Sequence, residues 1–238
     1  CVGSSGFIGR QIYSDLKDKN EFEIFRFSSR NNQFIDRCDI KKFDYLIFTA
    51  GVHNKSEDDA KDIFFESKKI LRNTKQLFFN SDSIVYISSF KTSINTNEKI
   101  IKSSNKYNYY EYDNYYGKSK IIFEKIFIKF CKNFKKKFTI ICPTHVIGPG
   151  DTNLSANGKF FQEILNKKII FFPNCKISIV DVRNLSQKIK DIVIKDEFEN
   201  LKIIINDKSL DLEDYIKEIK LDKKKYFNFK INFFLIKI

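Results

Sequence analysis

The stretch that decides the fold is Cys1-Val2-Gly3-Ser4-Ser5-Gly6-Phe7-Ile8-Gly9-Arg10, which directly precedes a predicted helix over Phe7–Lys19. In a strand–turn–helix unit, Gly3 permits the tight turn, Gly6 lets a pyrophosphate approach the backbone, and Gly9 lets the helix lie against the sheet. The helix N-terminus offers its free N–H groups to phosphates. The stretch therefore predicts a dinucleotide-binding turn, and a plain glycine-rich turn is the alternative.

Only two residues, Cys1 and Val2, precede this turn, and the sequence contains no methionine. A full strand should come before such a turn. We therefore expect the chain to be a piece of a longer protein, with its first strand truncated; the family resemblance described below implies that its second lobe is incomplete as well.

The end of the second predicted strand, Glu21–Phe27, bears on the identity of the dinucleotide. An acidic residue there accepts hydrogen bonds from a ribose 2′-OH, but this chain has Ser28-Ser29-Arg30. Neutral donors with an arginine suit a 2′-phosphate, so we predict an NAD(P) site in which Ser28 and Arg30 slightly favour NADP(H); Arg30 as a solvated loop residue is the alternative. Asp39, followed by Ile40, is a candidate for contact with the adenine, or else a helix cap.

Short β-rich runs alternate with helical segments over the first two-thirds of the chain. This alternation predicts an α/β fold, a Rossmann-type doubly wound parallel sheet with a small C-terminal α/β substrate lobe. The predicted strands are Glu21–Phe27, Tyr45–Thr49, Ser83–Ser88 and Phe138–Cys142, and the predicted helices are Phe7–Lys19, Ser56–Asn80 and Tyr115–Asn133. The polar, low-complexity stretch 89–114 predicts a loop or mobile lid.

A shift of composition after Pro143 predicts a boundary between lobes. The run PTHVIGPGDTNLSANG carries two of the three prolines and three of the eight glycines. We expect an NAD(P)-binding domain over 1–150 and a smaller lobe over 151–238. Within the second part we predict helices near 160–166, 182–193 and 210–219 and strands near 177–180 and 202–205, with helix 182–193 packing back on the first domain.

Composition and charge bear on possible partners. The formal charge is +13, but only six of the 43 basic residues are arginine, and the lysines are spread along the whole chain. A nucleic-acid-binding protein is expected to cluster its charge and to use arginine. The five cysteines form no CxxC pair, and the apolar runs are far shorter than the roughly 20 residues that cross a bilayer. We expect a cytoplasmic protein with no metal, nucleic acid or membrane partner.

A tyrosine and a lysine have the spacing of an acid–base pair. Within 107–116 only Tyr116 has a lysine, Lys120, four residues further on, and a helix puts the two side chains on one face. A nearby ammonium group stabilises a phenolate, so Tyr116 can exchange a proton with a substrate while a nicotinamide exchanges a hydride. Ser89, at the end of strand 83–88, can hydrogen-bond the reacting oxygen. The alternatives are a surface pair and an ordinary turn serine.

Together these motifs resemble the extended short-chain dehydrogenase/reductase superfamily, and within it the NAD-dependent epimerase/dehydratase family. The resemblance rests on the glycine turn, the strand Leu46–Gly51, the run VYISS ending at Ser89, Tyr116–Lys120 followed by Glu124, Pro143–Gly150 and Val180–Arg183. It implies that Ser89, Tyr116 and Lys120 are catalytic. It also implies a cofactor site lined by Gly3, Ser5, Gly6, Phe7, Ile8, Thr49, Ala50, Gly51, Pro143, His145 and Val146, together with Tyr116 and Lys120, where His145 contributes its backbone.

Three departures from the family pattern bear on the reaction. Cys142 stands where many members carry arginine, and Asn184 where aspartate is frequent. Phe90-Lys91 follow Ser89, where dehydratases tend to carry Asp-Glu, so dehydration is disfavoured. We expect an epimerase or reductase acting on a nucleotide-activated sugar, with a homodimer as one assembly to test. The alternatives are a flavonol-reductase-like carbonyl reductase of a small molecule and a non-catalytic dinucleotide-binding sensor.

Overall fold

The computed structural model describes residues 1–17, 21–39, 41–51, 60–93, 115–166, 169–220 and 227–231. The helices are α1 (Phe7–Lys17), α2 (Ala60–Phe79), the 3-10 helix η2 (Phe90–Ser93), α3 (Tyr115–Asn133), α4 (Ala156–Asn166), α5 (Val182–Ile194) and α6 (Leu212–Lys220). The strands are β1 (Phe27–Ser28), β2 (Gln33–Phe34), β3 (Phe43–Phe48), β4 (Ser81–Ile87), β5 (Lys137–Pro143), β6 (His145–Ile147), β7 (Ile169–Pro173), β8 (Lys176–Asp181), β9 (Leu201–Ile205), β10 (Lys208–Asp211) and β11 (Phe227–Ile231).

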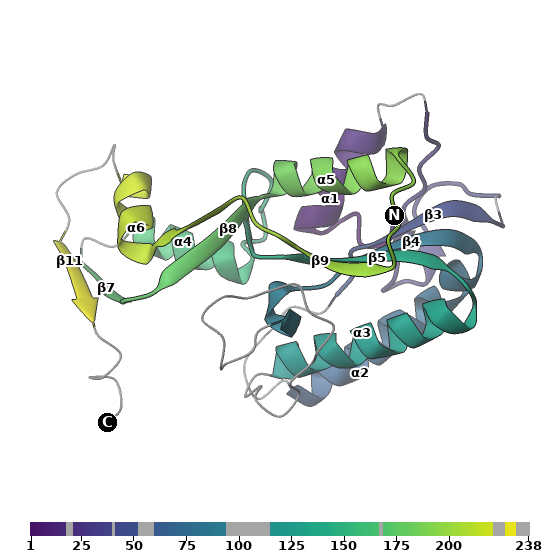
Figure 1. Cartoon of the computed structure of the whole chain (residues 1–238), viewed down its shortest axis with the longest axis horizontal. Coiled ribbons are helices and arrows are strands. Elements are labelled where there is room, and N and C mark those ends of the chain that lie inside the picture. Colours follow the sequence, from purple (N-terminus) through teal and green to yellow (C-terminus); the bar gives the residue numbers. More distant parts are fainter. Residues whose placement is uncertain are drawn as a thin grey trace.

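The central feature is a parallel sheet of four strands in the order β3-β4-β5-β9 (Figure 1). Val2 forms parallel bridges to both Phe27 and Phe48, which attaches the β1–β2 ribbon beside β3. The N–H of Val2 donates to the carbonyl of Ile47 at 2.9 Å, and the N–H of Thr49 donates to the carbonyl of Val2 at 2.9 Å. The predicted Rossmann-type α/β fold is confirmed.

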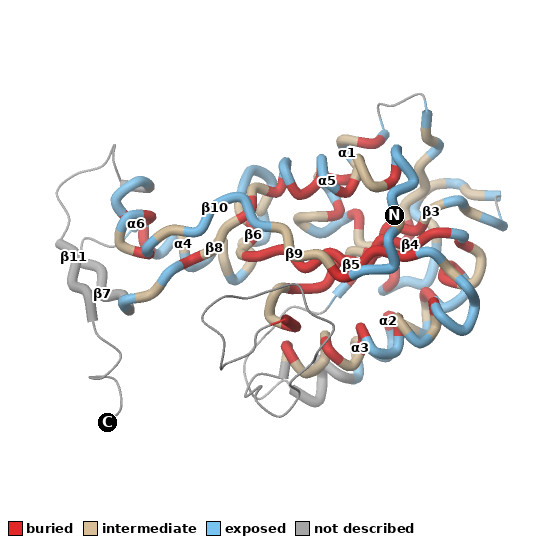
Figure 2. Tube along the Cα trace, viewed as in Figure 1, coloured by how far each residue is buried: buried red, intermediate tan, exposed pale blue. Residues whose placement is uncertain are grey.

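Helices cover both faces of this sheet, α1 and α5 on one and α2 and α3 on the other (Figure 1). Strands covered on both faces read as nearly continuous apolar runs, and β4 and β5 are buried along almost their whole length (Figure 2). On the α2–α3 face the rings of Phe48, Tyr86 and Phe123 pack with centroids 4.8 to 5.9 Å apart. This rigid sheet holds the strand ends that carry the candidate site.

The second lobe is a smaller mixed sheet with its own core. β8 pairs in parallel with β6 and antiparallel with β10, and α4 and α6 pack beside them around Ile164, Ile177, Leu212, Tyr215 and Ile216. β7 and β11 form a separate parallel pair. After β8 the chain returns to the first sheet, because α5 packs against α1 and β9 pairs with β5. The division at residue 150 stays a prediction.

Two of the sequence expectations for local structure need correction. Of the strand predicted over Glu21–Phe27, only Phe27 is in a strand, at the start of β1. Within the described residues, Phe27 forms an isolated bridge with Val2 and pairs antiparallel with Phe34. The loop predicted to start at residue 89 begins instead with η2, whose residues Thr92 and Ser93 are buried. The rest of that stretch, 94–114, lies outside the described residues.

Candidate active site

The glycine turn has the shape that the sequence predicts. Gly3 has a φ of +84°, and a Cβ there would lie 2.6 Å from Thr49 Oγ1 and 2.8 Å from the backbone nitrogen of Ala50. A Cβ on Gly9 would lie 2.6 Å from the same Thr49 oxygen, so both positions admit only glycine without rearrangement. Gly6 donates its N–H to the carbonyl of Gly3 at 3.0 Å and is exposed at the start of α1. The exposed N-terminus of α1 fits the phosphates of a dinucleotide.

The end of β3 lies beside this turn and reaches α3. Thr49 Oγ1 donates to the carbonyl of Val2 at 2.8 Å, which fixes the end of β3 on the first turn. A Cβ on Gly51 would lie 2.8 Å from Lys120 Nζ, so the ammonium group lies directly against the backbone of Gly51. A pocket follows this contact and is lined by Ala50, Gly51, Ser67, Ile70, Tyr86, Ser119, Lys120 and Phe123. The contact joins segments that are far apart in the sequence.

Two lysines flank the ring of Tyr116. Lys120 Nζ lies 5.8 Å from the ring centroid, as the spacing on α3 predicts, and Lys91 Nζ from η2 lies 5.8 Å from it as well. The hydroxyl of Ser119 donates to the carbonyl of Tyr116 at 2.8 Å and ties the first turn of α3. No motif in the sequence predicts a role for Lys91 at the tyrosine, because only the folding of η2 against α3 brings its ammonium group there.

Ser89 lies at the carboxyl end of β4, the edge where open parallel sheets bind their ligands. The residue is buried, and its Oγ accepts the N–H of Lys91 at 3.3 Å. Its carbonyl accepts the N–H of Thr92 at 3.0 Å. The structure therefore gathers Ser89, Tyr116 and Lys120 around η2 and the start of α3; their roles stay predictions.

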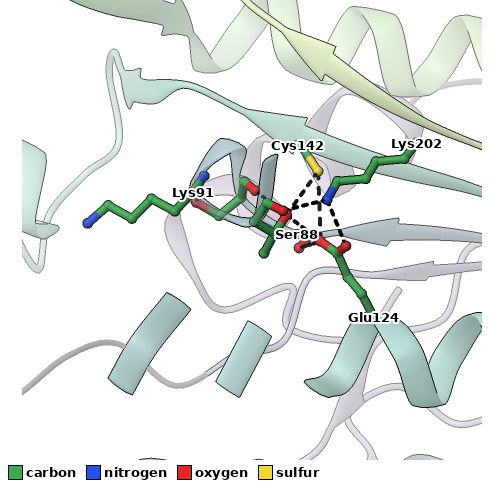
Figure 3. Close-up of polar contacts among 7 residues, drawn as sticks. Ser88, Lys91, Glu124, Cys142 and Lys202 are labelled. Carbon is green, nitrogen blue, oxygen red and sulfur yellow. Dashed lines mark hydrogen bonds and ion pairs between the residues drawn. The ribbon is translucent and has the colours of Figure 1, made fainter. Parts of the chain in front are cut away.

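Figure 3 shows a buried charged pair between β9 and α3. Lys202 Nζ on β9 lies 2.9 Å from Glu124 Oε2 on α3, with side-chain exposures of 1% and 0%. Sequence reasoning named Glu124 only as part of a resemblance and did not consider Lys202. The available signal was a lysine inside the run Leu201–Ile205, whose other residues are all apolar.

The segment after β5 brings the second lobe to the site. Pro143 and Val146 are buried, as is expected for residues beside a cofactor pocket or in a core. His145 is half-buried, with Nδ1 2.9 Å from the carbonyl of Ser178 and its ring centroid 5.0 Å from that of Phe90. Burial holds the pKa of His145 below its usual value and favours the neutral ring. The imidazole thus links β6 and β8 to η2.

The residues predicted to choose the dinucleotide lie on the surface near β1. Ser28 Oγ accepts the N–H of Asn31 at 3.2 Å, and Arg30 is exposed. Asp39 is 84% exposed at its side chain and lies 3.5 Å from Arg37 Nε. Ile40 lies outside the described residues. Their part in cofactor binding stays a prediction.

Arg10 is a further residue near the glycine turn, and its contacts could not be predicted from a motif. Its Nη2 donates to the carbonyl of Ser5 at 3.0 Å, and its Nη1 donates to Thr152 Oγ1 at 3.3 Å. The guanidinium therefore connects the glycine turn to the segment that opens the second lobe.

Within the described ranges, no three His, Cys, Asp or Glu side chains are grouped so as to hold a metal ion, and no helix is long and apolar enough to span a membrane.

An open parallel sheet with a phosphate-type glycine turn at its first crossover defines a Rossmann-like protein with a dinucleotide-type site. The family model described as "NAD dependent epimerase/dehydratase family" matches residues 1–172, and the chain belongs to that family. The resemblance stated from the sequence is thereby confirmed.

Solved structures share this fold at low sequence identity. UDP-N-acetylglucosamine 4-epimerase from Bacillus cereus matches with a TM-score of 0.71 and 14% identity, over 98% of this chain and 87% of that one. UDP-glucose 4-epimerase from Thermus thermophilus, in complex with NAD, matches with a TM-score of 0.68 and 13% identity, over 97% of this chain and 85% of that one. RMD from Pseudomonas aeruginosa, complexed with NADPH, matches with a TM-score of 0.70 and 13% identity, over 96% of this chain and 86% of that one. No curated protein sequence matches the chain.

Proposed function

We propose that the chain is an NAD(P)-dependent epimerase or reductase that acts on a nucleotide-activated sugar, with Tyr116 as the acid/base. The observation that carries the proposal is the position of Lys120, which lies against Gly51 at the end of β3 and also beside the ring of Tyr116. One ammonium group thereby lies against the predicted cofactor crevice and near the predicted proton donor. Membership in the family and the likeness to two UDP-sugar epimerases support the choice of substrate class.

The residues present fit a nicotinamide dinucleotide. The glycine turn leaves no space for side chains at Gly3 and Gly9, and it presents exposed backbone at Gly6. A bound nicotinamide would supply the hydride acceptor and donor. The absence of an acidic residue in Ser28-Ser29-Arg30 favours NADP(H) over NAD(H).

The side chains around η2 have different roles in the proposed reaction. Tyr116 as the phenolate takes a proton from a substrate hydroxyl, and as the phenol it gives a proton to a carbonyl oxygen. The Ser89 hydroxyl, at the end of β4, hydrogen-bonds that oxygen and stabilises its developing charge. Lys120 Nζ and Lys91 Nζ each lie 5.8 Å from the centroid of the Tyr116 ring, so two ammonium groups lie near the proposed acid/base.

The two residues after Ser89 favour epimerisation or reduction over dehydration. Elimination of water needs an acid and a base beside the sugar. Here Phe90 instead packs its ring on His145, and Lys91 directs an ammonium group toward Tyr116. Neither side chain offers the carboxyl group that a dehydratase of this family would use.

The proposal is tested by offering the chain a panel of UDP-, dTDP- and GDP-sugars with NAD(H) or NADP(H). Epimerisation would appear by NMR as a new sugar isomer without net change in the nicotinamide, and reduction as equal amounts of oxidised nicotinamide and reduced sugar. Turnover of small carbonyl compounds alone would support the flavonol-reductase-like alternative. Dinucleotide binding without any turnover would contradict the proposal and support a sensor.

A further inference from the structure

Five buried polar side chains meet at one point beside the end of β4 (Figure 3). The carboxylate of Glu124 lies at the centre. Its Oε2 accepts from Lys202 Nζ at 2.9 Å, and its Oε1 accepts from the hydroxyls of Ser88 and, at 2.7 Å, Thr92. The thiol of Cys142 lies 3.9 Å from the same Oε1. The cluster thus joins α3, β4, η2, β5 and β9 through a single carboxylate.

Such a cluster needs a reason other than stability. Removing a carboxylate and an ammonium group from water costs several kcal/mol per ion, and their attraction offsets this only when the geometry is good. Apolar residues of similar volume often stabilise a core equally well. The charged pair lies on the α2–α3 face of the sheet, where Lys202 is opposite Ile140 of the apolar core. Compared with an apolar core, the pair adds conformational specificity, because its hydrogen bonds are satisfied in only one arrangement of the surrounding elements.

The arrangement that it specifies is that of the candidate catalytic residues. Glu124 follows Tyr116 and Lys120 on α3 at intervals of four residues, so the three share one side of the helix. The same carboxylate binds Ser88 and Thr92, and Thr92 in turn donates its N–H to the carbonyl of Ser89. Any shift of α3 relative to the end of β4 would break these bonds.

Lys202 brings a fifth element into this arrangement. Besides Glu124, its Nζ donates to the carbonyl of Thr92 at 3.1 Å, so the ammonium group holds both α3 and η2. Lys202 lies opposite Ile140 in the β5–β9 register. Cys142 on β5 brings only a thiol to the carboxylate, and the positive charge comes from Lys202 on β9.

We propose that Glu124 and Lys202 are positioning residues that hold Tyr116 and Lys120 on α3 at a fixed distance from Ser89. The catalytic roles rest on the proposed function, but the positioning does not. Glu124 and Lys202 bind each other, Ser88 and Thr92, so they act on the reacting groups through η2 and α3. Their loss therefore affects the geometry of the reaction more than the binding of the dinucleotide at the glycine turn.

The decisive variant removes both charges together, Glu124→Gln with Lys202→Met, because removing one would leave a buried charge unpaired. The double variant should fold, keep its dissociation constant for NAD(P)H within about twofold, and lose about 10- to 100-fold in kcat with little change in KM, as expected for a small misplacement of reacting groups. The matched control is Lys208→Met with Glu218→Gln, which removes an exposed 2.7 Å ion pair in the second lobe and should change none of these values.

A second measurement does not depend on activity. Hydrogen exchange should speed up selectively in η2 and the first two turns of α3 in the double variant, while α5 and β3 keep their protection. Uniform acceleration in all elements, or unchanged exchange with unchanged kcat, would overturn the proposal. If the wild-type chain turns over no substrate, the proposed function fails, and the exchange pattern alone then decides the positioning role.

Thr92→Val provides the milder variant if the double substitution prevents folding. It removes the hydroxyl that donates to Glu124 while keeping the volume and the backbone N–H that binds Ser89. We expect the same local increase in exchange, with a smaller fall in kcat. Full protection of η2 and the start of α3 in Thr92→Val would contradict the proposal.

Discussion

Lys120 lies where two segments from distant parts of the sequence meet. Its spacing from Tyr116 follows from the helical repeat and was predictable, but its contact with the backbone of Gly51 depends on how α3 packs against the sheet. A Cβ at Gly51 would displace the ammonium group. Single residues of the site were therefore predictable from motifs, whereas their contacts required the fold.

Lys120→Met should weaken dinucleotide binding and turnover together. The substitution keeps the length of the side chain but removes the charge beside Gly51 and Tyr116. A hydrogen bond to a charged group is worth about 1.5–3 kcal/mol, so we expect a roughly 10- to 100-fold higher dissociation constant for NAD(P)H by fluorescence titration. Lys129→Met, at an exposed position of the same helix, is the control and should bind normally.

Gly3→Ala should destabilise the chain more than Gly150→Ala. Both glycines have positive φ, +84° and +89°, so both substitutions impose backbone strain of about 1–3 kcal/mol. Only the Cβ at Gly3 would also meet Thr49 and Ala50, because Gly150 has open space around it. Urea unfolding of the two variants measures the difference. Equal losses of stability would show that the glycine turn is not closely packed on β3.

At the scale of elements, long amphipathic helices were predicted closely and short strands were not. The predicted helix Tyr115–Asn133 coincides with α3, and the predicted helix over 182–193 ends one residue before α5 does. β6 and β10 have three and four residues, too few for a periodic pattern to be visible, and they exist because β8 pairs with both. Strand pairing of this kind is a tertiary property that a sequence window does not contain.

Asp181→Ala should destabilise α5 by about 1 kcal/mol, the usual value of an N-cap. The Asp181 carboxylate caps the helix by accepting the N–H of Arg183 at 2.8 Å, and it also accepts from the Arg183 guanidinium. These bonds, chiefly the one from the guanidinium, hold the pKa of Asp181 below its usual value of 3.8. The stabilisation is therefore present above about pH 4 and is lost as the pH falls through the lowered pKa.

Denaturant unfolding of wild type and Asp181→Ala at neutral and acidic pH checks this prediction. The difference in the free energy of unfolding between wild type and Asp181→Ala should become smaller at low pH. Asp191→Ala, later in the same helix, is the control and should show a smaller loss at neutral pH, since Asp191 accepts a side-chain bond from Gln187 and caps no N–H at the start of the helix.

At the scale of the whole molecule, the first sheet combines strands from the first two-thirds of the chain with one strand, β9, from near its end. β9 and α5 follow the second-lobe strand β8 and yet complete the first sheet and its helical layer (Figure 1). The packing of helix 182–193 on the first domain was predicted, whereas the pairing of β9 with β5 was not. Lys202 belongs to the returning strand, which is why the ion pair with Glu124 was invisible in the sequence.

The burial of two thiols reports the integrity of the whole fold. Burial raises the pKa of Cys131 and of Cys142 to about 12, so both stay protonated and unreactive near neutral pH. Native alkylation followed by mass spectrometry should label Cys38 and leave these two unmodified until the chain unfolds. Because their folded pKa values exceed the usual 9.0, the stability that they contribute should be lost as the pH rises from about 9 to 12. Rapid labelling of Cys142 in the native state would contradict the packing of the core.

The turnover of Tyr116→Phe, with dinucleotide binding measured on the same protein, tests the proposed chemistry most directly. The substitution removes only the hydroxyl, so the chain should bind NAD(P)H as the wild type does while kcat for the nucleotide sugar falls by about 10² to 10⁴-fold. Tyr215→Phe, in the core of the second lobe, serves as the matched control and should keep its activity. Undiminished turnover by Tyr116→Phe with intact dinucleotide binding would contradict the role of Tyr116 as the acid/base.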